Sequence, residues 1–146
     1  MPILGQAAKI LEINCPQPDA FGACSISMKG GFQLSVIAPP FAGFVYLAAP
    51  ICVLDHMDTK QLYRRALETN YMVTATRGTT LAIDPDANQL LVCVRFRLDM
   101  LTAEIFAKEV LSIGAVTEKL RETLPSVQGA DESKNLSSLS ILGMSV

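Results

Sequence analysis

Two stretches of the chain alternate apolar with polar residues, and a turn sequence divides each stretch. In residues 21–38 the two runs are separated by Gly30-Gly31, and in residues 81–98 by Asp84-Pro85-Asp86-Ala87-Asn88. Alternation with period two places one face of a strand against a core, so both stretches are predicted to form β-hairpins. The alternating apolar positions are Cys24, Ile26, Met28, Phe32, Leu34 and Val36 in the first hairpin and Leu81, Ile83, Leu90, Val92, Val94, Phe96 and Leu98 in the second.

Three other stretches carry apolar residues at helical spacing. They predict a short amphipathic helix over residues 3–13, a second helix from Asp58 to about Asn70 and a third from Thr102 to Leu124. The sequence Asp58-Thr59-Lys60-Gln61 is typical of a capping box that starts a helix. Residues 41–53 form an apolar run that is predicted to be a buried strand, interrupted by Gly43 and Pro50.

The predicted elements follow one another in the order α-β-β-β-α-β-β-α, which indicates an α+β fold with a twisted antiparallel sheet packed with helices. An amphipathic helix that follows a hairpin buries its apolar face by covering the sheet. We expect a single domain over residues 1–125. After Pro125 the composition becomes polar, so residues 126–146 are predicted to form a flexible polar tail whose last residues, 139–146, are apolar again.

The composition is typical of a globular protein and is rich in apolar residues. Hydrophobic residues make up 50% of the 146 residues and charged residues 18%, and the net charge of −2 provides no basic surface for nucleic acid. Residues 30–54 carry no charge and are long enough to cross a membrane, but Pro39, Pro40, Gly43 and Pro50 interrupt them, so no membrane insertion is expected. Without a secretory signal pattern and with scattered cysteines, the predicted location is the cytoplasm.

No residue pattern predicts catalysis, a metal or a cofactor. The D-x-D-x-N sequence at Asp84 resembles the start of a calcium loop, but Gln89 and Arg95 occupy the positions of the required Gly and Glu, and an Asp-Pro turn accounts for the same residues. His56 is the only histidine, and Cys15, Cys24, Cys52 and Cys93 form no C-x-x-C pair. A small enzyme that uses His56 or a cysteine is an alternative, but a binding protein is the better default.

The segment from Leu62 to Leu124 resembles the class I chaperones of bacterial type III secretion, the Tir chaperone superfamily. Leu62–Asn70 looks like the second helix of that family, and residues 80–86 followed by 89–92 look like its strand, acidic turn and strand. Residues 98–101, leading to Phe106, fit its closing pattern, and a looser similarity extends back to Ile3. The first helix is shorter than is usual in the family, and the segment after Pro125 is longer.

The resemblance implies a noncatalytic, cytoplasmic homodimer of a Gram-negative bacterium, which binds the N-terminal region of a secreted effector and keeps it soluble and secretion-competent. An alternative with the same fold is a secretion regulator that sequesters an anti-activator or another control protein. The resemblance places partner binding on the first helix and first hairpin, at Ile3, Leu4, Ala7, Ile10, Leu11, Ile26, Met28, Leu34 and Val36. It places dimer contacts on the second helix, at Leu62, Tyr63, Ala66 and Leu67.

Half of the residues are hydrophobic, which is more apolar surface than a core of this size readily buries. This composition supports a partner-binding surface independently of the resemblance. A large exposed apolar patch usually marks an interaction site. A partner segment can pair with a free strand edge or lay apolar anchors in a groove between helix and sheet. Apolar positions that alternate along a strand also serve a protein core, so each predicted binding residue has a core role as its simplest alternative.

Overall fold

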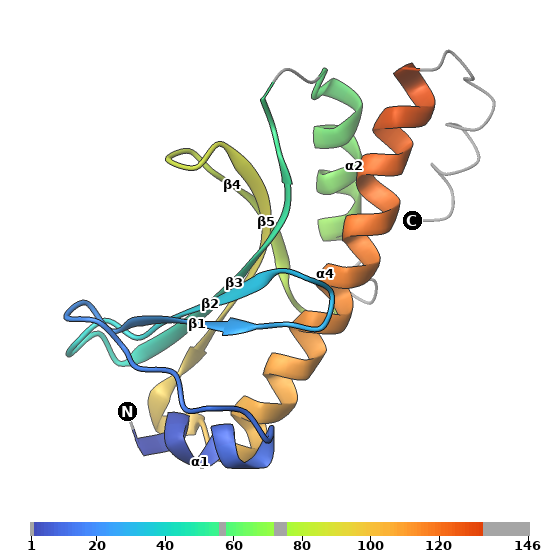
Figure 1. The fold of residues 1–146 in the computed structure, drawn as a ribbon. Coiled ribbons are helices and arrows are strands. Elements are labelled where there is room, and N and C mark those ends of the chain that lie inside the picture. The colour runs from blue at the N-terminus through green and yellow to red at the C-terminus, as the bar shows by residue number, and fades with distance from the viewer. Residues whose placement is uncertain (1, 56–57, 72–75, 133–146) are drawn as a thin grey trace. The chain divides into compact units, whose positions relative to one another are not determined.

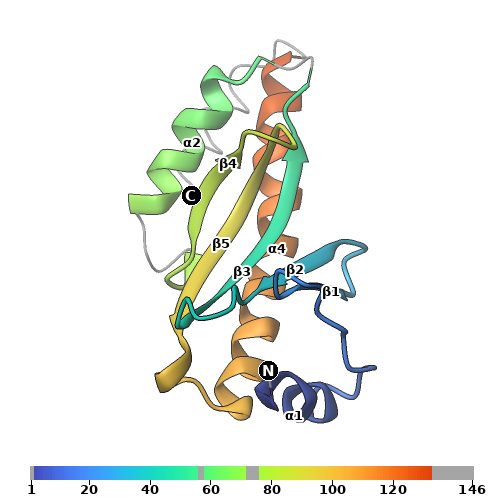
Figure 2. The ribbon, with the colours of Figure 1, turned by 90° about the vertical axis from the view of Figure 1, so that its left-hand side faces the viewer.

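The computed structural model describes residues 2–55, 58–71 and 76–132. In chain order it contains α1 (Pro2–Ile10), β1 (Ala23–Ser27), β2 (Gln33–Ile37), β3 (Phe44–Val53), α2 (Lys60–Tyr71), β4 (Thr80–Asp84), β5 (Gln89–Arg97), the short 3-10 helix η1 (Leu98–Met100) and α4 (Ala103–Glu132) (Figure 1). The strands form one antiparallel sheet in the order β1-β2-β3-β5-β4, and Figure 2 shows β5 between β3 and β4. The predicted α+β class and element order are confirmed.

The chain divides into two compact units. Unit 1 comprises Met1–Ala49 and Cys93–Ala115, and unit 2 comprises Pro50–Val92 and Val116–Val146. Each unit has its own buried apolar side chains. Those of unit 1 include Leu4, Ala7, Ile26, Phe32, Leu34, Val36, Val45, Leu47, Phe106, Val110 and Ile113, and those of unit 2 include Ile51, Leu54, Leu62, Ala66, Leu81, Leu90, Val92, Val116, Leu120 and Leu124.

The first predicted hairpin lies in unit 1. β1 and β2 pair from Ala23 opposite Ile37 to Ser27 opposite Gln33. The N–H of Met28 donates to the carbonyl of Phe32 at 2.9 Å and closes the turn, which contains Gly31 at φ +81°. The alternation in the sequence therefore predicted this hairpin and its turn correctly.

Helix α1 ends three residues before the predicted end at Ile13, because the chain turns at Glu12. Glu12 has a left-handed backbone with φ +57°. The N–H of Glu12 donates to the carbonyl of Lys9 at 3.2 Å, and that of Ile13 donates to the carbonyl of Ala8 at 3.0 Å. These two bonds form a Schellman motif, which usually contains Gly at the turning position. The sequence lacks that glycine and therefore carries no signal for this helix end.

Pro50 does not interrupt β3, in contrast to the prediction. The pairing of β3 with β2 runs only from Tyr46 to Ala48, so the missing N–H of Pro50 removes no bond of that ladder. Within unit 2 the carbonyl of Pro50 accepts a hydrogen bond from Arg121 Nη1 at 2.9 Å. The predicted strand over residues 41–53 is otherwise found, but it begins at Phe44, after Gly43.

The second helix and most of the second predicted hairpin lie in unit 2, but residues 93–97 of β5 belong to unit 1. Asp58 Oδ1 accepts a hydrogen bond from the N–H of Lys60 at 3.2 Å, at the start of α2. In the β4–β5 turn, Asp84 Oδ1 accepts from the N–H groups of Asp86 at 2.9 Å and Ala87 at 3.2 Å. The acidic residues of the calcium-like sequence are therefore turn residues, as the sequence indicated.

The predicted end of the third helix at Leu124 is wrong, since α4 continues to Glu132. Pro125 removes one backbone donor, but Gln128 and Ala130 beyond it have high helix propensity. Polar composition alone does not distinguish such a helical turn from a tail. The rest of the predicted tail, from residue 133, lies outside the described residues.

The hairpin of unit 1 depends on a close approach at Gly22. A Cβ atom there would lie 2.1 Å from the carbonyl oxygen of Ala38, and Gly22 has φ +78°. Gly31 has a similar φ of +81°, but a Cβ atom added to Gly31 would have no heavy atom within 4 Å. The two glycines therefore share a backbone conformation and differ in the space around them.

We expect Gly22→Ala to lower the free energy of unfolding by about 3 kcal/mol and Gly31→Ala by about 1 kcal/mol, because only the first adds a backbone clash. Urea unfolding followed by circular dichroism measures both values. Equal losses for the two variants would contradict the packing of Gly22 against Ala38.

Candidate functional site

β1 is an edge strand, so one side of its backbone has no neighbouring strand. The N–H of Ala38 donates to the carbonyl of Gly22, and the N–H of Met28 donates to that of Phe32, each at 2.9 Å. Hydrogen-bonded positions alternate along an antiparallel pair. The backbone N–H and carbonyl groups of Ser25 and Ser27 therefore point away from β2, toward the open edge.

At Ala23, the first residue of β1, the outward backbone groups are hydrogen-bonded to Asp19. Asp19 Oδ1 accepts a hydrogen bond from the N–H of Ala23 at 2.9 Å, and the N–H of Asp19 donates to the carbonyl of Ala23, also at 2.9 Å. Within the described part of the chain, the outward backbone groups of Ser25 and Ser27 make no such bond. The free edge of β1 is therefore confined to residues 25–27.

A groove of about 530 Å³ lies along this free edge. One wall is the chain that follows α1, and the other is β1. The lining residues are Glu12, Ile13, Asn14, Cys15, Pro16, Ser25, Ile26 and Ser27. Since an extended peptide binds a sheet edge through its main chain, the groove can accept a short strand beside Ser25 and Ser27.

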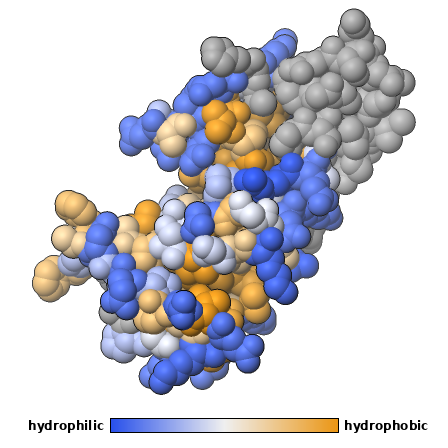
Figure 3. All heavy atoms as spheres, in the orientation of Figure 1, coloured by the Kyte–Doolittle hydropathy of each residue, from blue (hydrophilic) through white to orange (hydrophobic). Residues whose placement is uncertain are grey.

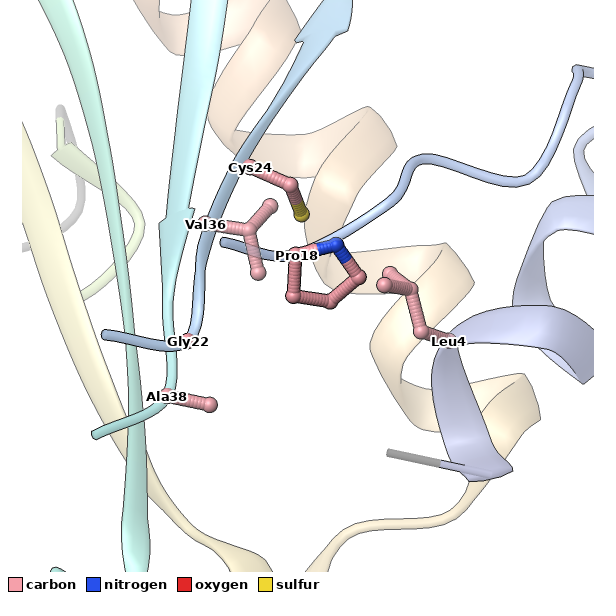
Figure 4. Close-up of a pocket in the computed structure, with 6 residues that line it drawn as sticks. All are labelled: Leu4, Pro18, Gly22, Cys24, Val36 and Ala38. Atoms are coloured by element: carbon pink, nitrogen blue, oxygen red, sulfur yellow. The ribbon is translucent and has the colours of Figure 1, made fainter. Parts of the chain in front are cut away.

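A second, smaller cavity of about 80 Å³ lies between α1 and the β1–β2 hairpin. Figure 4 shows the side chains of Leu4, Pro18, Cys24 and Val36 gathered around it, with Gly22 and Ala38 at its lower side. It is smaller than the cavity of about 150 Å³ that binds benzene in another protein, so it suits a small aliphatic side chain. The lining is apolar and contains two of the predicted binding residues, Leu4 and Val36.

The predicted partner-binding residues all lie in unit 1 but differ in exposure. Ile10 is 50% exposed, and Ile3, Leu11 and Met28 are partly buried. The methyl group of Met28 lies against Gly114 of α4, where an added Cβ atom would be 2.5 Å away. The remaining predicted residues are buried within the chain: Leu4, Ala7, Ile26, Leu34 and Val36. Their partner-binding role stays a prediction, while the free edge at Ser25 and Ser27 follows from strand order and has no apolar signal in the sequence.

The predicted dimer residues lie on α2, in unit 2. Leu62 and Ala66 are buried, Tyr63 is partly buried and Leu67 is 69% exposed. Tyr71, one turn after Leu67 on the same helix face, is 85% exposed. Figure 3 shows apolar residues, in orange, at the surface among hydrophilic ones on one face of the molecule. A dimer role for the predicted residues stays a prediction.

Two hydrogen bonds of the Asn70 side chain join α2 to β4. Its Nδ2 donates to the carbonyl of Leu81 at 3.1 Å, and its Oδ1 accepts from the N–H of Leu81 at 2.8 Å. On β4, Ile83 is 46% exposed. Leu67, Tyr71 and Ile83 thus form an exposed apolar set on two elements of unit 2 that are joined by hydrogen bonds.

The described residues include two thiols and one phenol whose pKa values are shifted. No group of three or more His, Cys, Asp and Glu side chains among them is placed to hold a metal ion. Burial raises the pKa of the Cys24 and Cys52 thiols, which keeps them protonated and weakly nucleophilic at neutral pH. A hydrogen bond with Cys93, together with burial, raises the pKa of Tyr46 to about 12. His56 lies outside the described residues, and no described helix is both long and apolar enough to cross a membrane.

The model of the Tir chaperone protein (CesT) family matches residues 3–121 of the chain. The chain belongs to this family. The match covers both units and confirms the resemblance that the sequence indicated between Leu62 and Leu124 and, more loosely, back to Ile3. No curated protein matches the chain by sequence.

Solved structures share the fold of this Tir chaperone family member at low sequence identity. A chain of the ExsC–ExsE complex has a TM-score of 0.71 and 14% identity, covering 84% of this chain and 91% of that one. A chain of the HopA1–SchA chaperone–effector complex has a TM-score of 0.65 and 16% identity, covering 83% and 91%. A chain of the Yersinia pestis type III secretion chaperone SycH in complex with a fragment of YscM2 has a TM-score of 0.62 and 15% identity, covering 82% of this chain and 97% of that one.

One buried guanidinium of this family member has two nitrogens without a hydrogen-bond acceptor among the described residues. Arg65 lies on the buried face of α2 and is 4% exposed. Its Nε and Nη1 atoms form no hydrogen bond within the described part of the chain. Burial lowers the pKa of this guanidinium, and the charge of Glu68 opposes the shift. Burying a charged group whose donors are not all hydrogen-bonded costs desolvation free energy.

We therefore expect Arg65→Met to raise the free energy of unfolding by about 1 to 3 kcal/mol, since Met fills similar space without a charge to desolvate. Arg64→Met is the matched control. Arg64 is exposed and pairs with Glu68 at 3.4 Å, so its replacement should change stability by less than about 1 kcal/mol. Urea unfolding of both variants gives the comparison. A loss of about 2 kcal/mol or more for Arg65→Met would show that the guanidinium has an acceptor in solution.

Proposed function

We propose that this protein is a type III secretion chaperone that binds an extended N-terminal segment of a secreted effector and keeps it soluble and secretion-competent in the bacterial cytoplasm. Membership of the Tir chaperone family supports the chaperone role. The observation that carries the proposal is the free edge of β1 at Ser25 and Ser27, which opens onto a groove of about 530 Å³. Two structures with a similar fold were solved as complexes, HopA1–SchA and ExoT–SpcS. The first of these is a chaperone–effector complex.

The binding mode needs no catalysis. The client main chain bonds to the outward groups of Ser25 and Ser27, which gives affinity without requiring a particular sequence. Selectivity comes from side chains, one of which enters the apolar cavity beside Leu4 and Val36. Because the client is held extended along an edge, its own apolar residues are prevented from collapsing or aggregating.

We further propose that the protein acts as a homodimer through α2 and β4. Leu67 and Tyr71 on α2 and Ile83 on β4 are exposed apolar side chains, and β4 is the second edge of the sheet. Isologous interfaces use one self-complementary patch on both copies, which a helix face and an adjacent strand edge provide.

The client proposal predicts a sharp difference between two substitutions at Ser25. The tagged protein is used to capture its partner from a bacterium with a type III secretion system, and mass spectrometry identifies what co-purifies. Ser25→Pro removes an N–H that points away from β2, so the β1–β2 ladder is retained while the edge is blocked. We expect Ser25→Pro to weaken client binding at least about tenfold and Ser25→Ala, which keeps the N–H, to bind as the native protein does.

The identity of the captured protein distinguishes the two functions of this fold. A secreted protein held through its N-terminal region supports the effector chaperone. A cytoplasmic control protein, held at the same edge, would instead support the regulator that sequesters an anti-activator. Equal client binding by Ser25→Pro and Ser25→Ala would rule out the β1 edge as the binding site.

The homodimer proposal predicts that a charge on α2 separates the copies. Leu67→Asp with Tyr71→Asp should convert a dimer into a monomer in size-exclusion chromatography with light scattering, because the carboxylates would be desolvated at the interface. Leu111→Asp on α4 is the control, since Leu111 is 61% exposed but lies in unit 1. A native protein that is strictly monomeric at micromolar concentration would contradict the homodimer.

A further inference from the structure

Within unit 1, the sheet has one face that is directed away from α4. On β3, Val45 and Leu47 are fully buried, whereas Phe44 and Tyr46, which alternate with them, are partly exposed. Successive side chains of a strand point to opposite faces of the sheet. Figure 1 shows the residues of α4 that belong to unit 1 on one side of β3 and β5. Phe44 and Tyr46 therefore lie on the face that α4 does not cover.

The neighbouring strands bring an aliphatic residue and an arginine to the same face. Ile37 on β2 is the register partner of Tyr46 and is partly buried. On β5, Cys93 shares a hydrogen bond with the side chain of Tyr46, and the guanidinium carbon of Arg95 lies 5.3 Å from the centroid of the Phe44 ring. Ile37, Phe44, Tyr46 and Arg95 thus form one surface across three strands of unit 1, which we call the open face.

The two arginines at the end of β5 differ in their partners. Arg97 donates to both carboxylate oxygens of Asp99, from Nε at 3.1 Å and from Nη2 at 2.6 Å. Arg95 is exposed and forms no ion pair with any other described residue. An arginine that is held over an aromatic ring keeps N–H donors for a bidentate carboxylate. The open face therefore carries one positive charge that no carboxylate of the described chain balances.

This combination of one cation with apolar side chains favours a protein partner over a nucleic acid. A nucleic acid is bound by neutralising several phosphates, which takes several lysines or arginines. The open face has only Arg95, and the whole chain has a net charge of −2. A single carboxylate between apolar side chains matches both the charge of Arg95 and the aromatic and aliphatic surface beside it.

We propose that the open face binds a protein segment that presents an aspartate or glutamate between apolar residues, with the carboxylate on Arg95 and the apolar side chains on Ile37 and Tyr46. This surface uses side chains, whereas the edge of β1 uses the backbone groups of Ser25 and Ser27. The inference therefore goes beyond the proposed function and does not depend on it. A client that reaches both surfaces would be selected by its charge as well as by its main chain.

Binding of a short probe peptide to the full-length protein, followed by NMR of the 15N-labelled protein, tests the open face. The probe is N-acetyl-Leu-Glu-Phe-Leu-amide, and the control peptide has Gln in place of Glu. Titration is read from the Nε–H resonance of Arg95 and the backbone amide of Tyr46. We expect the Glu peptide to bind at least about tenfold more tightly than the Gln peptide, because only the Glu peptide offers a carboxylate to Arg95.

Two variants locate this preference on one arginine. In Arg95→Gln the affinity for the Glu peptide should fall to that for the Gln peptide. Arg97→Gln with Asp99→Asn is the matched control, since it removes the neighbouring ion pair and leaves Arg95 in place, and the preference should be unchanged. Equal affinity of the native protein for the two peptides, or the same preference in Arg95→Gln as in the native protein, would overturn the proposal.

Ser25→Pro keeps this inference separate from the proposed function. We expect Ser25→Pro to bind the Glu peptide as the native protein does, even though it binds client weakly. If Ser25→Pro loses the peptide, the peptide occupies the edge of β1 and the open face is not its site. If Ser25→Pro keeps both the peptide and the client, the open face stands and the edge of β1 is not the client site.

Discussion

β1 has a neighbouring strand on one side only, so its outward backbone groups are available for hydrogen bonds with another chain. The β1–β2 ladder takes the groups of every second residue, and Asp19 takes those of Ala23. Ser25 and Ser27 are left facing a groove. Such exposed edge groups are available to pair with another chain, and the proposed binding function depends on this property. The rest of unit 1 holds that edge in place.

The two units meet different physical requirements. Unit 1 buries an uncharged hairpin and leaves a strand edge open, with the tight contact of Gly22 and Ala38 fixing the hairpin at its base. Unit 2 joins α2 to β4 through the two hydrogen bonds of Asn70 and leaves Leu67 and Tyr71 exposed. It also buries the Nε and Nη1 atoms of Arg65 without a hydrogen-bond acceptor among the described residues, and this desolvation opposes the stability that the apolar contacts of α2 provide.

Sequence patterns predicted what depends on local periodicity. The alternation around Gly30-Gly31 and around Asp84 predicted both hairpins, and the element order predicted the fold class. The end of α1 at Glu12 was not predictable, because its Schellman motif uses a residue other than Gly. The free edge at Ser25 was not predictable either, since it depends on the strand order and on Asp19, and serines carry no apolar signal. Leu4 and Val36 were found by pattern, but only the structure shows that they line a cavity.

Isotope-edited NMR of the complex with the captured client can detect the pairing of a client strand with β1. If the client strand pairs with β1, we expect intermolecular nuclear Overhauser effects between client backbone protons and those of Ser25 and Ser27, with slowed exchange of these two amides. Client contacts confined to α2 and β4, with the resonances of Ser25 to Ser27 unchanged, would contradict it.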